Sequence, residues 1–242
     1  MPSPNGIRAI FYDLDGTLRT SVPLGREAFA QQAAALGLVT SAETVRRAAI
    51  WEHRYFAESP ELISDRETFH DDSQAFWLNY CSRQLQALGA TPEQARELAP
   101  QLNAYMGEHF RPQDIIFEDV HETLRTLRES GYFLGIMSNR FEPYSDYLDE
   151  RGLGELFDLV VYAGQAGIRK PNPEVFHFML DKAGFSPSES MYVGDNYFAD
   201  VVGARRAGMQ PVLFDRHQLF ESPDCPVITE HAQLLDILAG RK

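Results

Sequence analysis

The sequence predicts an α/β protein with a doubly wound parallel sheet and an all-helical insertion. The first and last parts of the chain alternate short apolar runs with amphipathic segments, as crossover connections between parallel strands require. From about residue 19 to residue 112, by contrast, helix-start signals follow one another without a convincing strand. We therefore expect residues 1–18 and 113–242 to form the sheet domain and residues 19–112 a helical domain.

The sheet domain contains short apolar runs that we interpret as buried strands. They are Ile7–Tyr12, Tyr132–Met137, Leu159–Tyr162, Met191–Val193 and Pro211–Phe214. The helices between them have recognisable ends. We predict Asp119–Ser130 ending at Gly131, a helix capped by Asn172 that runs from Pro173 to Gly184, and Tyr197–Ala207 ending at Gly208.

The insertion carries its own helix signals. Capping boxes are predicted at Thr40–Glu43, Ser64–Glu67 and Thr91–Gln94, with helix ends at Gly37, Pro60 and Gly89. The chain is expected to enter and leave the insertion at proline-containing hinges, near Thr20–Pro23 and Phe110–Pro112. Aromatic residues recur at roughly helical spacing, which indicates a helix-bundle core in preference to a cofactor site. These residues are Trp51, Tyr55, Phe56, Phe69, Phe76, Trp77 and Tyr80.

The charge balance excludes several partners. With a net charge of −13 and a pI near 4.9, the protein repels nucleic acid and anionic membrane surfaces, so neither is expected to bind. No apolar run approaches the roughly 18 residues that span a bilayer. A phosphorylated substrate would be repelled as well, unless its site is made locally positive by a metal ion or by placed Lys and Arg side chains.

The cysteines and the N-terminus favour a cytoplasmic protein. Cys81 and Cys225 form no CxxC pair and are too few for a disulfide framework, so we expect two free thiols. Residues 1–6 have neither the basic nor the apolar region of a signal peptide.

Polar residues follow four of the predicted strands, at the edge where parallel sheets place their sites. The carboxylates Asp13 and Asp15 follow the first strand, and Ser138-Asn139 follow the second. Lys170 lies in the loop after the third, and Asp195 and Asp200 follow the fourth. Clustered carboxylates suit Mg²⁺, while a hydroxyl and an ammonium can hold phosphoryl oxygens. An Asp carboxylate in such a site can attack phosphorus and form an aspartyl-phosphate.

These motifs resemble those of the haloacid dehalogenase superfamily, in order and in separation. The resemblance covers almost the whole chain and rests on Asp13-Leu14-Asp15-Gly16-Thr17, Ser138-Asn139, Lys170-Pro171-Asn172-Pro173 and Gly194-Asp195-Asn196-Tyr197-Phe198-Ala199-Asp200. Within this superfamily, the resemblance is strongest to the phosphatase-type subfamily I, whose members are similar to phosphoglycolate phosphatases. It implies a Rossmann-like core and a helical cap domain, formed here by the insertion.

The resemblance also implies a role for each matching residue. Asp13 is then the nucleophile and a metal ligand. Asp15 protonates the leaving oxygen, deprotonates the hydrolytic water and binds Mg²⁺ through its backbone carbonyl. Ser138 and Asn139 bind the phosphoryl group, and Lys170 neutralises its charge. Asp195 is a further metal ligand, and Asp200 supports the metal shell or Lys170. Gly16 and Thr17, in the first motif, are expected to contact the substrate.

Other residues give no comparable signal. Arg140 and Arg169 flank the motifs, and we interpret them as solvated, as most arginines are. The seven histidines show no zinc-ligand spacing, and the sequence contains no G-x-S-x-G, Walker A or G-x-G-x-x-G motif.

We expect a Mg²⁺-dependent phosphatase that acts on a small phosphorylated metabolite. A phosphomutase similar to β-phosphoglucomutase begins with the same chemistry, but no mutase motif is recognisable in the insertion. A 2-haloacid dehalogenase generally lacks the second aspartate, so Asp15 argues against it. A non-catalytic binding module has no support, because every expected chemical position is intact. Both a monomer and a homodimer are compatible with the sequence.

Overall fold

The computed structural model describes residues 6–240, so most of the N-terminal segment considered above lies outside it. The chain forms two compact units. One, which we call the helical unit, is Ser21–Ile115; the other, the core unit, comprises the chain up to Thr20 and from Ile116 onward. The predicted division fell after residue 18 and after residue 112, within three residues of these positions.

The core unit is built on a six-stranded sheet with the order β5-β4-β1-β6-β7-β8. Every neighbouring pair in it is parallel. The strands are β1 (Ala9–Tyr12), β4 (Phe133–Ser138), β5 (Leu159–Tyr162), β6 (Ser190–Gly194), β7 (Gln210–Phe214) and β8 (Val227–Ile228). The predicted doubly wound α/β fold is confirmed. Strand β8 was not predicted, because two residues are too short to show a periodic pattern.

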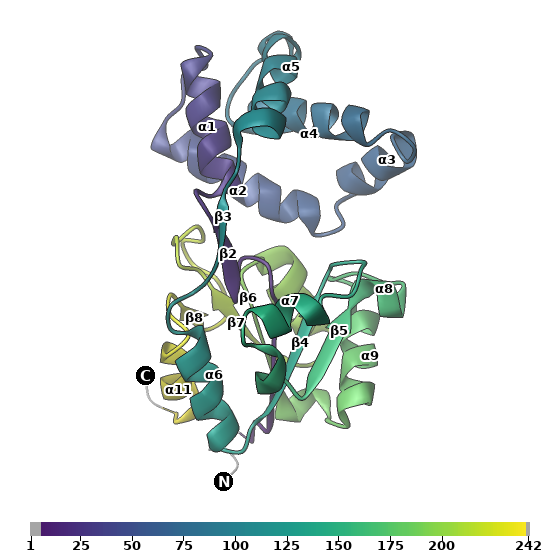
Figure 1. Cartoon of the computed structure of the whole chain (residues 1–242), viewed down its shortest axis with the longest axis vertical. Helices are drawn as coiled ribbons and strands as arrows, with labels where there is room; N and C mark the ends of the chain where they lie inside the picture. The colour runs from purple at the N-terminus through teal and green to yellow at the C-terminus, as the bar shows by residue number, and fades with distance from the viewer. Residues whose placement is uncertain (1–5, 241–242) are drawn as a thin grey trace. The chain divides into compact units, whose positions relative to one another are not determined.

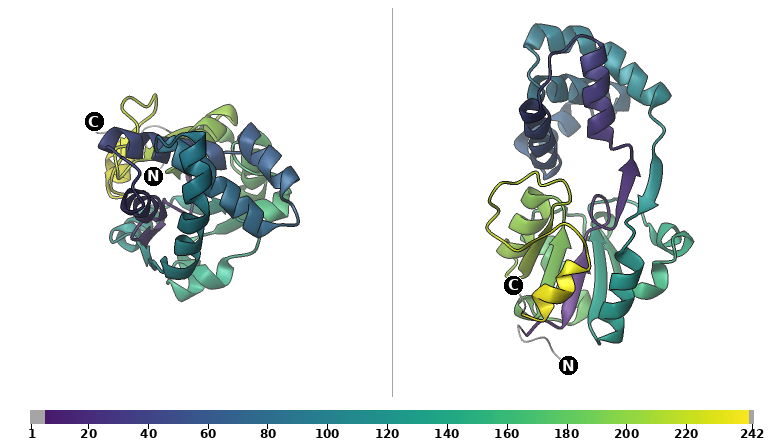
Figure 2. Two further views of the ribbon diagram at one scale, coloured as in Figure 1. Left: turned by 90° about the horizontal axis from the view of Figure 1, so that it is seen from above. Right: turned by 90° about the vertical axis from the view of Figure 1, so that its left-hand side faces the viewer.

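Helices cover both faces of this sheet (Figure 2). Alternate residues of β1 point to opposite faces: Ile10 and Tyr12 belong to one hydrophobic cluster, Ala9 and Phe11 to the other. The first cluster is completed by α6 (Val120–Glu129), α7 (Ser145–Glu150) and α11 (Gln233–Leu238). The second is completed by α9 (Pro173–Ala183) and α10 (Val202–Arg206). Short connecting elements are η1 (Gly154–Leu156), α8 (Ala163–Ala166) and η2 (Pro187–Glu189).

The helix that follows β6 differs from its prediction. In place of one α-helix over Tyr197–Ala207, the chain forms a π-helix, η3 (Tyr197–Val201), before α10 begins. The Asn196 side chain accepts hydrogen bonds from the N–H groups of Phe198 and Ala199, both at 3.1 Å. The Asp200 carboxylate in turn accepts the N–H of Asn196 at 2.9 Å. These bonds to side chains occupy the N–H groups of the first turn, and they accompany the wider turn that carries Asp200.

The helical unit consists of α1 (Gly25–Ala35), α2 (Ala42–Phe56), α3 (Pro60–Thr68), α4 (Ser73–Ala87) and α5 (Pro92–His109). The capping box of α5, between Thr91 and Gln94, is confirmed. Two other helix starts were wrong. Helix α2 is capped by Ser41, one residue later than predicted. The predicted start at Ser64 lies inside α3, which Ser59 caps, so Pro60 begins that helix instead of ending one.

The expectation of no strand between residues 19 and 112 was also wrong. Strands β2 (Arg19–Val22) and β3 (Gln113–Ile116) pair as a two-stranded sheet, and the chain passes between the units within them (Figure 1). Neither segment alternates apolar and polar residues, because neither has a buried face. Their pairing joins residues more than 90 positions apart, so it leaves no local pattern in the sequence.

The aromatic residues predicted for the insertion form a core, with two exceptions, Phe69 and Trp77. Tyr55 and Tyr80 are buried with Leu62, and Trp51, Phe56 and Phe76 pack against them. Trp77 was predicted to belong to this core, but 49% of it is exposed. None of the helices formed by residues 6–240 combines the length and the apolarity needed to cross a membrane.

Candidate active site

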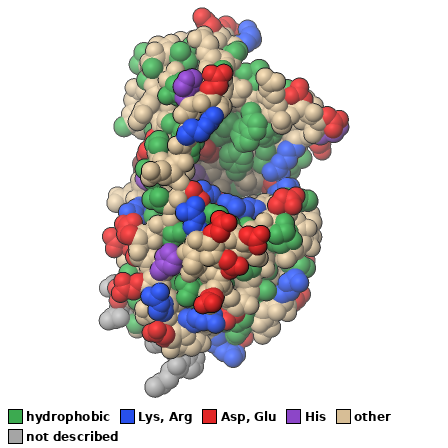
Figure 3. All heavy atoms as spheres, viewed as in Figure 1, with side chains coloured by type: hydrophobic (Ala, Val, Ile, Leu, Met, Phe, Trp, Pro, Cys, Tyr) green, Lys and Arg blue, Asp and Glu red, His purple; other side chains and the backbone are tan. Residues whose placement is uncertain are grey.

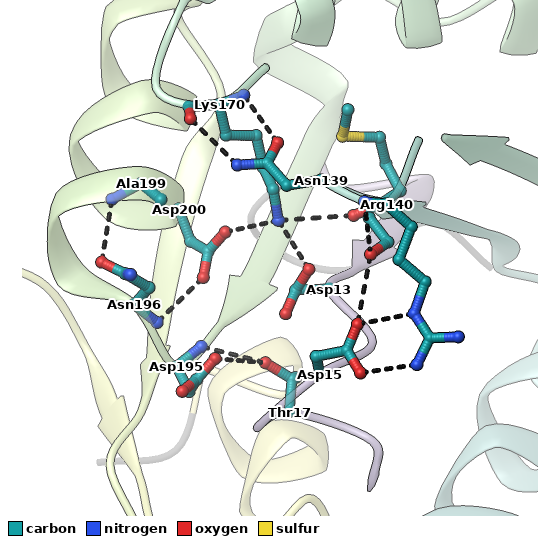
Figure 4. Close-up of polar contacts among 12 residues, drawn as sticks. Asp13, Asp15, Thr17, Asn139, Arg140, Lys170, Asp195, Asn196, Ala199 and Asp200 are labelled. Carbon is teal, nitrogen blue, oxygen red and sulfur yellow. Dashed lines mark hydrogen bonds and ion pairs between the residues drawn. The ribbon is translucent and has the colours of Figure 1, made fainter. Parts of the chain in front are cut away.

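The carboxyl ends of the central strands bring the predicted site residues together (Figure 4). Asp13 follows β1, and Lys170 reaches the same place from the loop before α9. The Lys170 Nζ atom lies 2.6 Å from Asp13 Oδ1 and 2.7 Å from Asp200 Oδ1. The buried ammonium therefore joins two carboxylates from segments far apart in the sequence.

Lys170 is held rigidly at the centre of the site. Its side chain is 2% exposed, and its ammonium also donates to the Tyr192 hydroxyl at 2.9 Å. Burial lowers the pKa of Lys170, but Asp13 and Asp200 outweigh that effect and hold it well above the usual value. The Asn139 amide fixes the Lys170 backbone, because its Oδ1 accepts the Lys170 N–H at 2.8 Å and its Nδ2 donates to the carbonyl at 3.0 Å. Asn139 was predicted only as a phosphoryl ligand; in the structure it positions Lys170.

Asp13 is a buried carboxyl group, 6% exposed. Burial disfavours its charged form, Lys170 favours it, and the carboxylates of Asp200 and Asp15 disfavour it again. The net effect raises the pKa of Asp13 to about 7. An excess of negative charge surrounds this group, which a bound cation would neutralise.

The residues present fit a divalent cation. Asp13, Asp195 and Asp200 each offer a carboxylate oxygen, and these oxygens lie within 4.8 Å of one another. Carboxylate oxygens are the ligands that Mg²⁺ takes in proteins. Gly16 allows this close approach, because a Cβ atom at its position would lie 2.3 Å from Asp195 Oδ2. Asp200, which was predicted to play a supporting role, lies within the cluster itself.

Thr17 positions Asp195. The Thr17 hydroxyl accepts the N–H of Asp195 at 2.9 Å and donates to its Oδ1 at 3.3 Å. Thr17 is completely buried. Its side chain therefore supports the acidic cluster, and the predicted contact of this residue with substrate stays a prediction.

Asp15 is bound by two arginines, and this arrangement was not predicted. Arg140 donates two hydrogen bonds to its carboxylate, Nε to Oδ2 and Nη2 to Oδ1, both at 2.8 Å. Arg19 pairs with the same carboxylate, and the Ser138 hydroxyl lies 3.4 Å from Oδ2. Burial raises the pKa of Asp15, but the two arginines outweigh it and the net effect is a lower pKa than usual.

The interpretation of Arg140 as a solvated side chain was therefore wrong. Its guanidinium lies 5.4 Å from the ring centre of Tyr147, and only a third of its side chain is exposed. Its position directly after Ser138-Asn139, at a strand end, was the available signal. Arg169 packs over the ring of Phe141, at 5.0 Å. Figure 3 shows Lys and Arg side chains gathered along one edge of the core unit, although the chain as a whole is acidic.

A family model for haloacid dehalogenase-like hydrolases matches residues 7–208. The match covers most of the chain, including every motif of the site. The chain belongs to the haloacid dehalogenase-like hydrolase family.

Two relatives that are named as phosphatases, and one solved structure, are similar to most of the chain. A phosphoserine phosphatase of Thermus thermophilus is 29% identical over 90% of this chain and 92% of its own length. A glyceraldehyde 3-phosphate phosphatase of Methanopyrus kandleri is 30% identical, over 87% of this chain and 84% of its own. Among solved structures, a 2-haloacid dehalogenase from Pseudomonas syringae pv. Tomato is 26% identical, with a TM-score of 0.55 over 97% of this chain and 99% of that one.

Proposed function

We propose that the protein is a phosphoric monoester hydrolase that acts on a small phosphorylated metabolite, with Asp13 as the nucleophile. The observation that carries the proposal is the contact of the buried Lys170 ammonium with both Asp13 and Asp200. This ammonium supplies the local positive charge that an acidic protein needs to accept a phosphate. The names of the two phosphatase relatives support the same activity.

The geometry suggests how Asp13 acts. Lys170 binds its Oδ1 and leaves Oδ2 to attack phosphorus. A bond forms between Oδ2 and phosphorus while the bond from phosphorus to the ester oxygen breaks. Asp15 gives a proton to the departing oxygen, which leaves as an alcohol. Water then attacks the phosphorus of the aspartyl-phosphate while Asp15 accepts its proton, and inorganic phosphate is released.

The remaining residues hold the phosphoryl group and the metal ion. Ser138 is proposed to bind phosphoryl oxygens next to Lys170, while the Asn139 amide keeps the Lys170 backbone in place. Asp13, Asp195 and the backbone carbonyl of Asp15 would hold Mg²⁺, which would supply positive charge to the phosphoryl oxygens when bound. Asp200 then keeps Lys170 in place through their 2.7 Å ion pair.

The test compares wild-type protein with Asp13→Asn in the hydrolysis of p-nitrophenyl phosphate with Mg²⁺. The variant keeps the shape of the side chain but loses the nucleophilic carboxylate, so we expect kcat to fall by about 1000-fold or more. Asp181→Asn, an exposed position on α9, serves as the matched control and should retain full activity. Chelation with EDTA should abolish wild-type activity, and added Mg²⁺ should restore it. Equal activity of Asp13→Asn and wild type would refute the proposal.

A dehalogenase is the second candidate, because the 26% identical structural relative from Pseudomonas syringae carries that name. The halide that leaves in dehalogenation needs no proton, whereas the alkoxide of a phosphate ester does. We propose Asp15, oriented by Arg140, as the proton donor that hydrolysis of a phosphate ester needs and dehalogenation does not. We expect no chloride release from 2-chloropropionate under conditions in which p-nitrophenyl phosphate is hydrolysed.

A further inference from the structure

The helical unit contains a cavity of about 520 Å³ between α1, α2, α4 and α5. Its wall is mainly apolar and includes Phe29, Phe56, Trp77 and Met106. A volume of this size falls in the range of small-molecule sites, roughly 300–1,000 Å³. Every lining residue lies between Ser21 and Ile115, so the cavity belongs to this unit alone.

Several polar side chains interrupt the apolar wall; they are Glu52, Ser73, Gln74, Gln84 and Asn103. Gln84 is only 4% exposed, and its side chain lines the cavity. A hydrogen-bond partner stabilises an amide in such surroundings. The cavity is the space that Gln84 lines, and a bound molecule can supply that partner.

Glu52 places a carboxyl group in the wall of the cavity. Its carboxylate accepts a hydrogen bond from the Tyr80 hydroxyl at 2.9 Å. Asn103 contributes its amide from α5, where its Oδ1 lies 3.6 Å from the sulfur of Cys81. The oxygens of a carboxyl group accept hydrogen bonds, so this part of the wall favours a ligand with a donor group over an anion. Trp77 adds a large, half-exposed ring to the same wall.

We propose that this cavity binds a small molecule with an aromatic or branched apolar body and an amine or hydroxyl head. The body packs against Phe29, Phe56 and Trp77. The head donates a hydrogen bond to Glu52, and the ligand satisfies the amide of Gln84. The site is built from the helical unit only, so this inference is independent of the proposed phosphatase activity.

The test is a titration of the full-length wild-type protein by calorimetry and by ligand-observed NMR. The probes are 2-phenylethylamine, 2-phenylethanol and 3-phenylpropionate, which share a ring but differ in the charge of the head. Since none is a phosphate ester, failure of the phosphatase proposal would leave the result unaffected. We expect saturable binding of the amine with a Kd of about 1 mM or tighter, and binding of the carboxylate at least about tenfold weaker.

Variants distinguish binding of the amine in the cavity from its nonspecific attraction to an acidic protein. Trp77→Ala should weaken binding of the amine by about fivefold or more, because it removes a wall of the site. Glu52→Gln should remove the preference for the amine over the carboxylate. Leu78→Ala is the matched control, because Leu78 is also exposed on α4 but does not line the cavity. The proposal is overturned if the amine shows no saturable binding up to about 20 mM, or if Trp77→Ala binds it as tightly as Leu78→Ala does.

Discussion

Arg140 and Asp15 form the most specific side-chain pair of the candidate site. The two hydrogen bonds are parallel, so they fix the direction of the carboxylate as well as its position. A third of Arg140 and two-fifths of Asp15 are exposed, so solvent screens the attraction between the charges. We therefore assign Arg140 a positioning role: it orients Asp15 for proton transfer.

We predict that Arg140→Leu lowers kcat for p-nitrophenyl phosphate by roughly 30-fold, because Asp15 loses its orientation. Arg140→Lys should recover little of this loss, since an ammonium cannot make the paired contact. The decisive measurement is a double-mutant cycle. In an Asp15→Asn background, adding Arg140→Leu should cost almost nothing, because the group that Arg140 orients is already absent. A full further loss in that background would show that Arg140 acts independently of Asp15.

At the scale of elements, the turn after β1 is what makes the acidic cluster compact. Gly16 has a φ of +90°, a conformation that disfavours any residue with a Cβ atom. The same glycine also faces Asp195, and an added Cβ would lie 2.3 Å from its carboxylate oxygen. Backbone conformation and close approach thus both require glycine at this position.

The substitution Gly16→Ala tests which requirement matters for function. Gly131→Ala is its matched control, because Gly131 has a φ of +88° but nothing within 4 Å of the added Cβ. Both variants should lose roughly 1 kcal/mol of stability through backbone strain. Only Gly16→Ala should also displace Asp195, and we expect it to need at least about tenfold more Mg²⁺ for half-maximal activity. Equal Mg²⁺ requirements in the two variants would contradict this assignment.

At the scale of the whole molecule, a buried histidine near the C-terminal end of the core unit contacts the loop near its N-terminal end. His231, next to α11, places Nδ1 2.9 Å from Asp119 Oδ1 and Nε2 2.9 Å from the backbone carbonyl of Thr17. The ring thus joins the Asp119 carboxylate to the backbone of the loop that carries Thr17. It also stacks on Phe214, with 4.4 Å between ring centres. The C-terminal segment therefore supports the loop that carries Thr17.

This contact predicts a loss of stability in acid. Burial raises the pKa of Asp119, but the hydrogen bond and charge of His231 outweigh it and lower the pKa from 3.8 to about 2. A carboxyl group whose pKa is lower in the folded than in the unfolded protein stabilises the fold at pH values above its unfolded pKa. That contribution, roughly 2 kcal/mol, is lost as the pH falls from about 4 to about 2. Urea unfolding of wild type and Asp119→Asn across this range measures it.

Asp119→Asn should be roughly 2 kcal/mol less stable than wild type at pH 7, and the gap should narrow in acid. Asp181→Asn, an exposed control, should follow the wild-type curve. A constant difference between Asp119→Asn and wild type from pH 7 to pH 2 would show that the ion pair is not the cause.

The sequence alone determined the sheet, its site edge and the acidic residues that meet there. Buried parallel strands appear as short apolar runs, and the polar residues that follow them lie at one edge by topology. Asp13, Lys170, Asp195 and Asp200 were located for this reason, and the caps of α9 at Asn172 and Gly184 were recognised from local chemistry.

Only the tertiary structure decided which side chains support those residues. The pairing of Arg140 with Asp15 joins positions 125 residues apart, and that of His231 with Thr17 joins positions 214 apart. The β2–β3 pairing and the cavity beside Gln84 likewise arise from segments brought together by folding. Periodicity and capping are local properties that the sequence displays directly. Contacts between distant side chains depend on the packing of the whole unit, so no local pattern encodes them.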